Sequence, residues 1–336
     1  MATRIGCPRL KGACVSSAAA LSPKIRSALA PGSLGDWPTP LESAPGLAAA
    51  CGAAALWLKR EDRSSPRCGG NKVRGLEFLL GPAPPDVVFL TAGGTGSSHC
   101  LLTAVHAGAL GARTVLAQFP QPDTDASRAV AAASAARAAL VVRARSPAGL
   151  PLALLQAWRA ARRMGPVRWI PPGGAHPRAV VGHLLAGLEL ESQLPDLPDA
   201  IVTPLGTGGT AAGLGLAVAA LSWPTRIVGV RVAPRLIANR WRTTRLARRA
   251  ALLLARHGIR LPLPASRFPL AVVEGLGVGY GHPTPLGEAA RRLAAPHGLV
   301  LDPTYGAKAF AAVPELARRG FRRIVFWHTF ALPGGE

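Results

Sequence analysis

Lys72 is the residue of this sequence whose type and setting are best suited to covalent chemistry. It lies in the segment Arg67-Cys-Gly-Gly-Asn-Lys-Val-Arg74, and a helical pattern follows it. Glycines directly before a lysine let another group come close. A lysine whose pKa is lowered by burial or by a positive neighbour can form a Schiff base. An isolated lysine is nearly always a solvated surface charge, so the segment alone leaves both interpretations open.

A second segment has the composition of an anion site. Gly206-Thr207-Gly208-Gly209-Thr210 follows a predicted strand and begins a predicted helix. Glycine lets the backbone approach a bound group, and the free N–H groups of a first helical turn favour an anion such as phosphate. The segment lacks the G-x-x-x-x-G-K-[ST] pattern of nucleotide P-loops. An ordinary strand-to-helix turn explains it equally well.

A third segment, Thr95-Gly96-Ser97-Ser98-His99, also lies between a predicted strand and a predicted helix. Its hydroxyl and N–H groups could hold a carboxylate. Simple N-capping of the helix by Ser97 or Ser98 is the more ordinary explanation. His99, taken alone, is an undistinguished helix residue.

The elements that would position these segments are short apolar runs alternating with alanine-rich helical patterns. The runs lack strict alternation, which is typical of strands covered on both faces. Predicted strands span residues 55–59, 87–92, 113–118, 140–143, 200–203, 226–231 and 323–327. Predicted helices include residues 98–109, 127–138, 151–163, 178–191 and 209–221. This order predicts an α/β fold with open, mostly parallel sheets, whose ligands bind beyond the carboxyl ends of the strands.

The composition is that of a globular enzyme with an unusual charge. The chain has 336 residues, of which 49% are apolar and 17% charged, and its net charge is +22. Such a charge suggests a polyanion partner. However, the arginines are spread along the whole chain, and the densest basic stretch, residues 235–260, contains Trp241 as its only aromatic residue. We therefore expect no specific nucleic-acid partner and keep a basic nucleic-acid binder as a minor alternative.

The cysteines and the N-terminus bear on the compartment. Five cysteines, with no C-x-x-C pair, argue against a disulfide framework or a metal site and suit a reducing compartment, so we expect a cytoplasmic protein. No apolar run is long enough to predict a membrane span. The first 30 residues are basic and contain no acidic residue. They could be a disordered extension, or a transit peptide to a mitochondrion or plastid.

Taken in order, these motifs resemble the family of 1-aminocyclopropane-1-carboxylate (ACC) deaminases and D-cysteine desulfhydrases. These are pyridoxal-phosphate enzymes of the tryptophan-synthase-β type. The resemblance covers roughly residues 37–332 and rests on the order of the motifs rather than on any one of them. The matching segments are Lys59-Arg60-Glu61-Asp62, Gly69-Gly70-Asn71-Lys72-Val-Arg74, Gly93-Gly94 with Ser97 and His99, Pro172-Gly173-Gly174, the 206–210 segment, Gly279-Tyr280-Gly281, Leu301-Asp302-Pro303-Thr304-Tyr305, Lys308 and His328-Thr329.

The resemblance implies a role for each matching residue. The catalytic group would be Lys72, Ser97, Tyr280 and Tyr305, with Lys72 carrying pyridoxal 5'-phosphate as a Schiff base. The cofactor would also contact Asn71, Ser98, Gly206, Thr207, Gly208, Gly209, Thr210 and Thr329. The substrate would contact Ser97, Ser98, His99, Tyr280 and Tyr305. A threonine hydroxyl beside the pyridine nitrogen leaves that nitrogen largely unprotonated, which suits elimination better than transamination.

The chain departs from the family at several positions. Gly96-Ser97-Ser98 stands where the family usually has Gln-Ser-Asn, and Gly75 replaces a lysine that helps to hold the phosphate. Gly306 stands where ACC deaminases have Glu and D-cysteine desulfhydrases have Thr. Phe330 interrupts the usual His-Thr-Gly-Gly. Because that Glu belongs to the acid–base groups of ring opening, Gly306 argues against ACC deaminase activity.

The resemblance implies a fold type II enzyme with two domains. Residues 31–74 and 173–336 would form the large, cofactor-binding domain, and residues 75–172 a small inserted one. We expect a homodimer that acts on a small amino acid, as a D-cysteine desulfhydrase-like lyase. The alternatives are an ACC deaminase-like enzyme, or a catalytically impaired member that serves as a binding protein.

Overall fold

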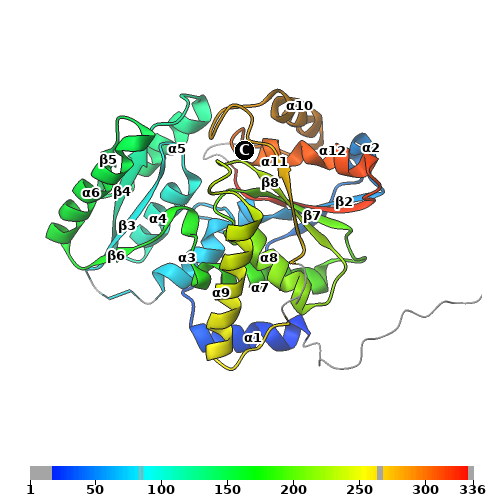
Figure 1. The fold of residues 1–336 in the computed structure, drawn as a ribbon, viewed down its shortest axis with the longest axis horizontal. Helices are drawn as coiled ribbons and strands as arrows, with labels where there is room; N and C mark the ends of the chain where they lie inside the picture. The colour runs from blue at the N-terminus through cyan, green and yellow to red at the C-terminus, as the bar shows by residue number, and fades with distance from the viewer. Residues whose placement is uncertain (1–16, 82, 85, 263–267, 332–336) are drawn as a thin grey trace, which may run out of the picture.

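Two sheets lie side by side in the computed structural model, which describes residues 17–81, 83–84, 86–262 and 268–331 (Figure 1). The larger sheet has the strand order β1-β2-β10-β7-β8-β9, and the smaller has the order β5-β4-β3-β6. The strands are β1 (Leu41–Ser43), β2 (Ala55–Arg60), β3 (Val88–Gly94), β4 (Arg113–Phe119), β5 (Leu140–Arg143), β6 (Val167–Trp169), β7 (Ala200–Leu205), β8 (Arg226–Arg231), β9 (Leu270–Glu274) and β10 (Arg323–His328).

The helices lie between these strands in sequence. They are α1 (Ala18–Leu29), α2 (Pro45–Cys51), α3 (Lys72–Leu80), α4 (Ser98–Ala109), α5 (Asp125–Ala135), α6 (Leu150–Met164), α7 (Pro177–Gln193), α8 (Gly209–Ala220), α9 (Arg240–Arg256), α10 (Pro285–Ala294), α11 (Gly306–Phe310) and α12 (Ala312–Arg318). None of the helices in the described ranges is long and apolar enough to cross a membrane.

The larger sheet is covered on both faces. Its strands are parallel except for β1, which pairs antiparallel with β2. One face packs against α1, α7, α8 and α9, and the other against α2, α10, α11 and α12. Burial on both faces explains why its strands consist of nearly continuous apolar residues. The α/β fold with mostly parallel sheets is the one predicted.

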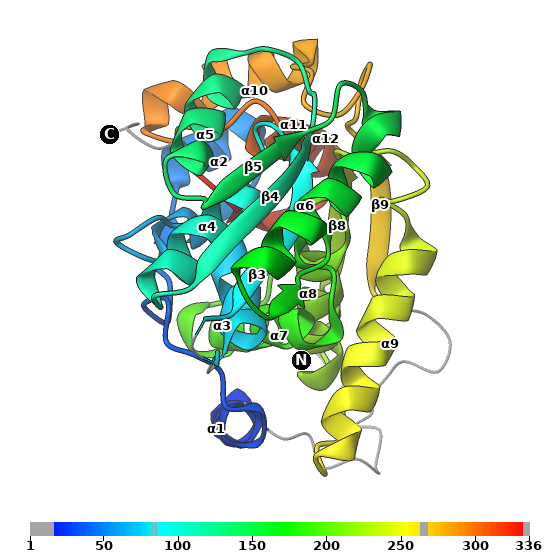
Figure 2. The ribbon, with the colours of Figure 1, turned by 90° about the vertical axis from the view of Figure 1, so that its left-hand side faces the viewer.

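The smaller sheet is fully parallel and lies beside the first (Figure 2). Helix α6 packs on one face through Ala157 and Ala161, whose small side chains let it lie close to β3 and β4. Helices α3, α4 and α5 form a separate apolar cluster with Phe89 of β3. Each sheet therefore has a core of its own.

Part of the expected N-terminal extension belongs to the folded protein. Helix α1 buries Ile25 and Leu29 in the apolar cluster that it shares with α7. Residues 1–16, which contain most of the basic residues of the expected transit peptide, lie outside the described residues, as do Cys7 and Cys14. Cys51, Cys68 and Cys100 are free thiols.

Candidate active site

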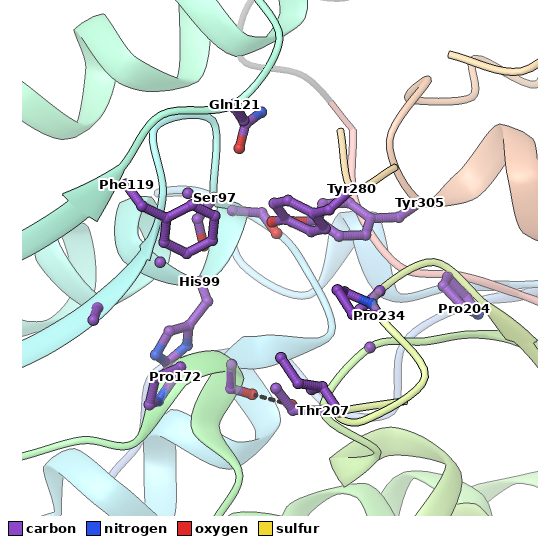
Figure 3. Close-up of a pocket in the computed structure, with 18 of the residues that line it drawn as sticks. Ser97, His99, Phe119, Gln121, Pro172, Pro204, Thr207, Pro234, Tyr280 and Tyr305 are labelled. Carbon is purple, nitrogen blue, oxygen red and sulfur yellow. Dashed lines mark hydrogen bonds between the residues drawn. The ribbon is translucent and has the colours of Figure 1, made fainter. Parts of the chain in front are cut away.

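A cavity of about 550 Å³ lies at the carboxyl ends of β3 of the smaller sheet and β7 of the larger sheet. Segments that follow strands of both sheets supply side chains to its wall (Figure 3). The predicted site residues on this wall are Asn71, Lys72, Ser97, Ser98, His99, Gly206, Thr207, Tyr280, Tyr305 and Thr329. Gly208, Gly209 and Thr210 lie behind the wall, where α8 begins. The fold thus brings the predicted segments together.

Lys72 is the first residue of α3 and reaches the cavity wall. The turn before it requires glycine, because a Cβ at Gly69 would lie 1.7 Å from the carbonyl oxygen of Asp62. The backbone N–H of Asn71 donates to the carbonyl oxygen of Thr329 at 2.8 Å, which ties the helix start to the end of β10. Burial lowers the pKa of Lys72 to about 8. Within the described residues its amine has no hydrogen-bond or ion-pair partner, so part of it is an unprotonated nucleophile near neutral pH.

Behind Lys72, the same helix is held by a cluster of buried charges. Arg74 donates to Glu61 at 2.8 and 3.0 Å and to both carboxylate oxygens of Glu189 on α7. Glu189 also accepts from Lys59 at 2.8 Å. Burial opposes the charge of Arg74, but the two carboxylates outweigh it and raise its pKa. The guanidinium also stacks over the ring of Trp37. These contacts fix α3, and with it Lys72.

The loop between β7 and α8 presents backbone N–H groups. The first intrahelical bond of α8 runs from Ala212 to the carbonyl oxygen of Gly208, so the earlier N–H groups have no partner in the helix. Gly208 has φ 89°, and a Cβ there would lie 2.6 Å from Thr243. Thr210 accepts a hydrogen bond from Asn71 Nδ2 at 2.7 Å, which joins the loop to the lysine segment. This loop can hold a phosphate.

Ser97 and His99 lie at the start of α4, which follows β3 of the smaller sheet. Ser97 is the N-cap, and its Oγ accepts from the N–H of Cys100 at 3.4 Å while also facing the cavity. The Oγ1 of Thr91 donates to the carbonyl oxygen of Ile170 and therefore accepts from His99 Nε2 at 3.0 Å. Nδ1 of His99 is then an acceptor, buried and without a partner in the described chain. Burial, together with the charge of Lys72, lowers the pKa of His99 to about 3, so the ring is neutral.

The two tyrosines, Tyr280 after β9 and Tyr305 before α11, enter the cavity and meet there (Figure 3). Their hydroxyl oxygens lie 2.5 Å apart. Burial raises the pKa of Tyr280 to about 12 and that of Tyr305 well above its usual value, so both hydroxyls keep their protons. Asp302 accepts from the backbone N–H groups of Thr304, Tyr305 and Gly306 at 2.7–3.0 Å and so fixes the loop of Tyr305.

Lys308 fixes the loop of the other tyrosine. Its amine donates to the carbonyl oxygens of Leu276 and Gly279 at 2.9 and 3.3 Å. The side chain is 2% exposed, and burial lowers its pKa to about 8. Lys308 therefore positions Tyr280 without lining the cavity itself.

Three residues that no sequence motif predicted also belong to the site. Phe119, the last residue of β4, and Gln121, just after it, line the cavity on the side of Ser97 (Figure 3). Gln121 Oε1 is buried and has no hydrogen-bond partner among the described residues. His183 of α7 lies with Lys72 and His99 in a narrow recess under the cavity. No sequence pattern near these residues marks them, because only the folded chain brings them to the cavity.

The structure gives a physical reason for two departures from the family pattern. A Cβ at Gly96 would lie 2.5 Å from Gln121 Nε2, so the Gln121 carboxamide fills the space above Gly96. A Cβ at Gly75 would lie 2.9 Å from the Cβ of Ala179, because α3 and α7 cross closely there. A lysine at position 75 would therefore not fit without a shift of the helices.

Two further departures fit their surroundings in a similar way. A Cβ at Gly306 would lie 2.9 Å from Asp302 Oδ2, so this carboxylate occupies the space beside Gly306. Phe330 is buried and packs beside Gly70. These substitutions are accommodated by packing and leave the cavity open.

The chemistry of the wall suits pyridoxal phosphate. Lys72 supplies an amine of lowered pKa, and the start of α8 supplies N–H groups for a phosphate in a chain of net charge +22. Further polar groups on or beside the wall could bind the cofactor ring and the substrate. They are the unpartnered Nδ1 of His99 and the hydroxyls of Ser97, Ser98 and Thr329. Within the described residues, no group of three or more His, Cys, Asp or Glu side chains could hold a metal ion.

Known proteins match almost the whole chain. Nocardicin C-9' epimerase of Nocardia uniformis is 35% identical over 87% of this chain and 90% of its own length. A putative ACC deaminase of Pyrococcus horikoshii is 31% identical over 89% of this chain and 90% of its own length. A D-cysteine desulfhydrase of Salmonella choleraesuis is 29% identical over 88% of this chain and 92% of its own length. The names differ, so they agree on a family and not on one substrate.

The fold comparison points the same way. The crystal structure of an ACC deaminase homologue, 29% identical in sequence, superposes with a TM-score of 0.78 over 92% of this chain and 94% of that one. The predicted fold type II architecture is therefore confirmed. Residues 32–329 match the family described as pyridoxal-phosphate dependent enzyme. The chain belongs to this family, and pyridoxal phosphate is its cofactor.

Proposed function

We propose that this enzyme removes the Cα proton of an amino acid and eliminates the β-substituent, as a D-cysteine desulfhydrase-like lyase. With cysteine as the substrate, cysteine and water give pyruvate, ammonium and hydrogen sulfide. The single observation that carries the proposal is that a lysine amine of lowered pKa shares one cavity with a serine hydroxyl and a pair of protonated tyrosines.

The cofactor, when bound, supplies a ring that withdraws electrons from Cα. The residues of the chain do the rest. Lys72, with Ser97 beside it, takes the Cα proton, while the hydroxyls of Ser97 and Ser98 orient the substrate carboxylate. The leaving thiolate receives a proton from the tyrosine pair, whose hydroxyls are held in reach by Asp302 and Lys308. A neutral His99 adds an acceptor without adding a charge.

Two alternative activities differ in their support. ACC ring opening is disfavoured by Gly306, because no carboxylate or hydroxyl side chain stands at the position of the family's acid–base group. Epimerisation is favoured by the 35% identity to Nocardicin C-9' epimerase. An epimerase would use the same proton removal and return the proton to the opposite face of Cα.

One experiment separates these activities. The purified, cofactor-loaded protein is incubated in deuterium oxide with D-cysteine, L-cysteine, D-alanine, L-alanine or ACC, and the products are followed by NMR and by sulfide release. We expect pyruvate and sulfide from a cysteine enantiomer. Deuterium at Cα of alanine together with conversion between its enantiomers, without pyruvate from cysteine, would favour the epimerase. Release of 2-oxobutanoate would favour the deaminase. Bound cofactor with no turnover and no exchange would favour a binding protein.

We also infer a cytoplasmic homodimer with no specific nucleic-acid partner. The free thiols Cys51, Cys68 and Cys100 support a reducing compartment. Light scattering of the purified protein measures the oligomeric state. Heparin binding that disappears at modest salt would identify the positive charge as non-specific.

A further inference from the structure

The cavity extends well beyond the groups that the proposed reaction needs. Ser97 follows β3, whereas Pro147 and Leu150 follow β5, and all three residues line the same cavity. Because β4 separates β3 from β5, the two strands that lead to these residues are about 10 Å apart, which is two strand spacings. The side chain of cysteine extends only two bonds beyond Cα. A lobe therefore remains between the tyrosine pair and the far wall.

The wall of this lobe is apolar and rigid. Prolines and large apolar side chains form it, and Ile237 is 40% exposed although it lines the cavity. Apolar side chains that face a cavity and stay exposed to water are typical of a surface that a ligand covers. The lobe is lined by Phe119, Pro120, Pro122, Pro147, Leu150 and Ile237.

Charge is missing from the lobe, although the chain is rich in arginine. The sequence has 39 lysines and arginines, yet among the described residues that line the cavity Lys72 is the only lysine, and arginine, aspartate and glutamate are absent. An acidic substituent would call for an arginine or lysine partner, and a basic one for a carboxylate. Gln121, whose Oε1 has no partner among the described residues, is a neutral polar group at the edge of the lobe (Figure 3), and His282 also lines the cavity.

We propose that the lobe binds a large, uncharged, apolar β-substituent, so that the substrate of the elimination is an S-substituted cysteine. This inference rests on the proposed function for its reaction and on the lobe for its substrate class. The Cα–H and Cβ–S bonds break, the thiolate takes up one proton, and the remaining aminoacrylate reacts with water. An S-substituted cysteine and water thus give a thiol, pyruvate and ammonium, with no oxidant or reductant.

The first test compares substrates on the cofactor-loaded wild-type enzyme. Cysteine, S-benzylcysteine and S-carboxymethylcysteine are assayed for pyruvate, each as both enantiomers. We expect S-benzylcysteine to have a kcat/KM at least about tenfold above that of cysteine. A single added methylene in an apolar pocket already raises kcat/KM by about tenfold, and a benzyl group is much larger than a methylene. S-carboxymethylcysteine should be the poorest. Pyruvate from cysteine with equal or lower kcat/KM for S-benzylcysteine would overturn the proposal.

A matched pair of variants tests the location of the lobe. Leu150 and Leu152 both lie in the first turn of α6, where an acidic residue is compatible with the helix dipole. Leu150 lines the cavity, whereas Leu152 is 60% exposed and does not. Leu150→Asp should lower the ratio of kcat/KM for S-benzylcysteine to that for cysteine by at least about tenfold. Leu152→Asp should leave that ratio unchanged. Equal ratios in the two variants would contradict the assignment.

Binding of analogues that cannot eliminate separates the lobe from the reaction. 2-Amino-5-phenylpentanoate, in which a methylene replaces the sulfur of S-benzylcysteine, should raise the thermal midpoint of the loaded enzyme more than 2-aminobutyrate does. Leu150→Asp should abolish this difference. If the difference is present but no cysteine derivative yields pyruvate, the proposed function fails and the lobe stands. If cysteine yields pyruvate but neither analogue is preferred, the lobe fails and the proposed function stands.

Discussion

On the side of Lys72 that faces α7, the buried Arg74 and Glu61 and the half-buried Glu189 are paired, whereas on the cavity side polar atoms are left without partners. Among the described residues, the Lys72 amine and Nδ1 of His99 have no hydrogen-bond partner. Lys72, at the cavity, and Arg74, in the paired cluster, are only two residues apart along α3.

The difference shows how the chain holds a reactive group. A buried polar atom without a partner is unfavourable, so it persists only where the surrounding structure fixes it. The paired charges behind Lys72 fix α3 against α7, and this rigidity keeps the unpartnered amine at the cavity. We therefore expect substitutions behind Lys72 to act mainly on stability and substitutions at the cavity to act mainly on catalysis.

The largest effect on stability should follow the loss of Arg74. Arg74→Leu leaves the buried Glu61 without its charged partner and the half-buried Glu189 with fewer partners, which should lower the free energy of unfolding by about 3–5 kcal/mol. Urea denaturation of the variant measures this loss. The control is Arg242→Leu, at an exposed position on α9, which should change stability by no more than about 0.5 kcal/mol. Similar effects of the two substitutions would remove the proposed contrast.

A smaller effect should come from pH at Asp302. Burial outweighs the three backbone N–H donors and raises its pKa from 3.8 to about 6. Because the folded state then binds the proton more tightly than the unfolded state, its contribution to stability is full below pH 3.8 and is lost as the pH rises through 6. The loss should be on the order of 3 kcal/mol.

The check is the free energy of unfolding measured between pH 4 and pH 7. Wild type should lose more stability over this range than Asp302→Asn, which does not titrate. Equal pH dependence in the two proteins would show that the Asp302 carboxyl is not perturbed.

The tyrosine pair should affect catalysis more than stability. Tyr305→Phe removes one of the two hydroxyls that lie 2.5 Å apart, and it should lower kcat/KM for elimination by about 100-fold, which is about 2.7 kcal/mol. The free energy of unfolding should fall by only about 1 kcal/mol, because phenylalanine fills the same space. Steady-state kinetics and urea denaturation of the same preparation measure both quantities. If Tyr305→Phe stays active but is strongly destabilised, the cavity residue acts on stability and not on catalysis, which contradicts the expected difference between the two regions.

Much of the fold follows from local sequence patterns. The predicted strands 140–143 and 226–231 and the predicted helix 98–109 have the bounds of β5, β8 and α4. Strands β1, β6 and β9 were not predicted, because short edge strands depend on pairing with a neighbour more than on their own residues. The arginine-rich stretch was interpreted only as charge. It forms α9, which buries Leu246, Ala250 and Leu254 at a spacing of four residues.

Local sequence patterns could predict the candidate site only where its residues lie in glycine-rich segments. Lys72, Ser97 and Thr207 belong to such segments, because a turn at a strand end needs glycine and leaves N–H groups free. Tyr305 and Thr329 were predicted only from the resemblance to the family. Gln121 at the cavity wall and His183 in the recess under it carry no local signal, because only the folded chain brings them there. The pairing of Arg74 with Glu189 joins residues 115 positions apart, so no spacing rule shows it.

The central claim is that Lys72 is the residue to which the cofactor is attached. Its most direct test is borohydride reduction of the cofactor-loaded protein, followed by proteolysis and mass spectrometry of the peptides. Lys308 is an internal control, because burial also lowers its pKa to about 8 although it does not line the cavity. We expect the pyridoxyl group on Lys72 alone, and its loss in Lys72→Ala. The same label on Lys308 or Lys59, or a label that persists in Lys72→Ala, would contradict the account.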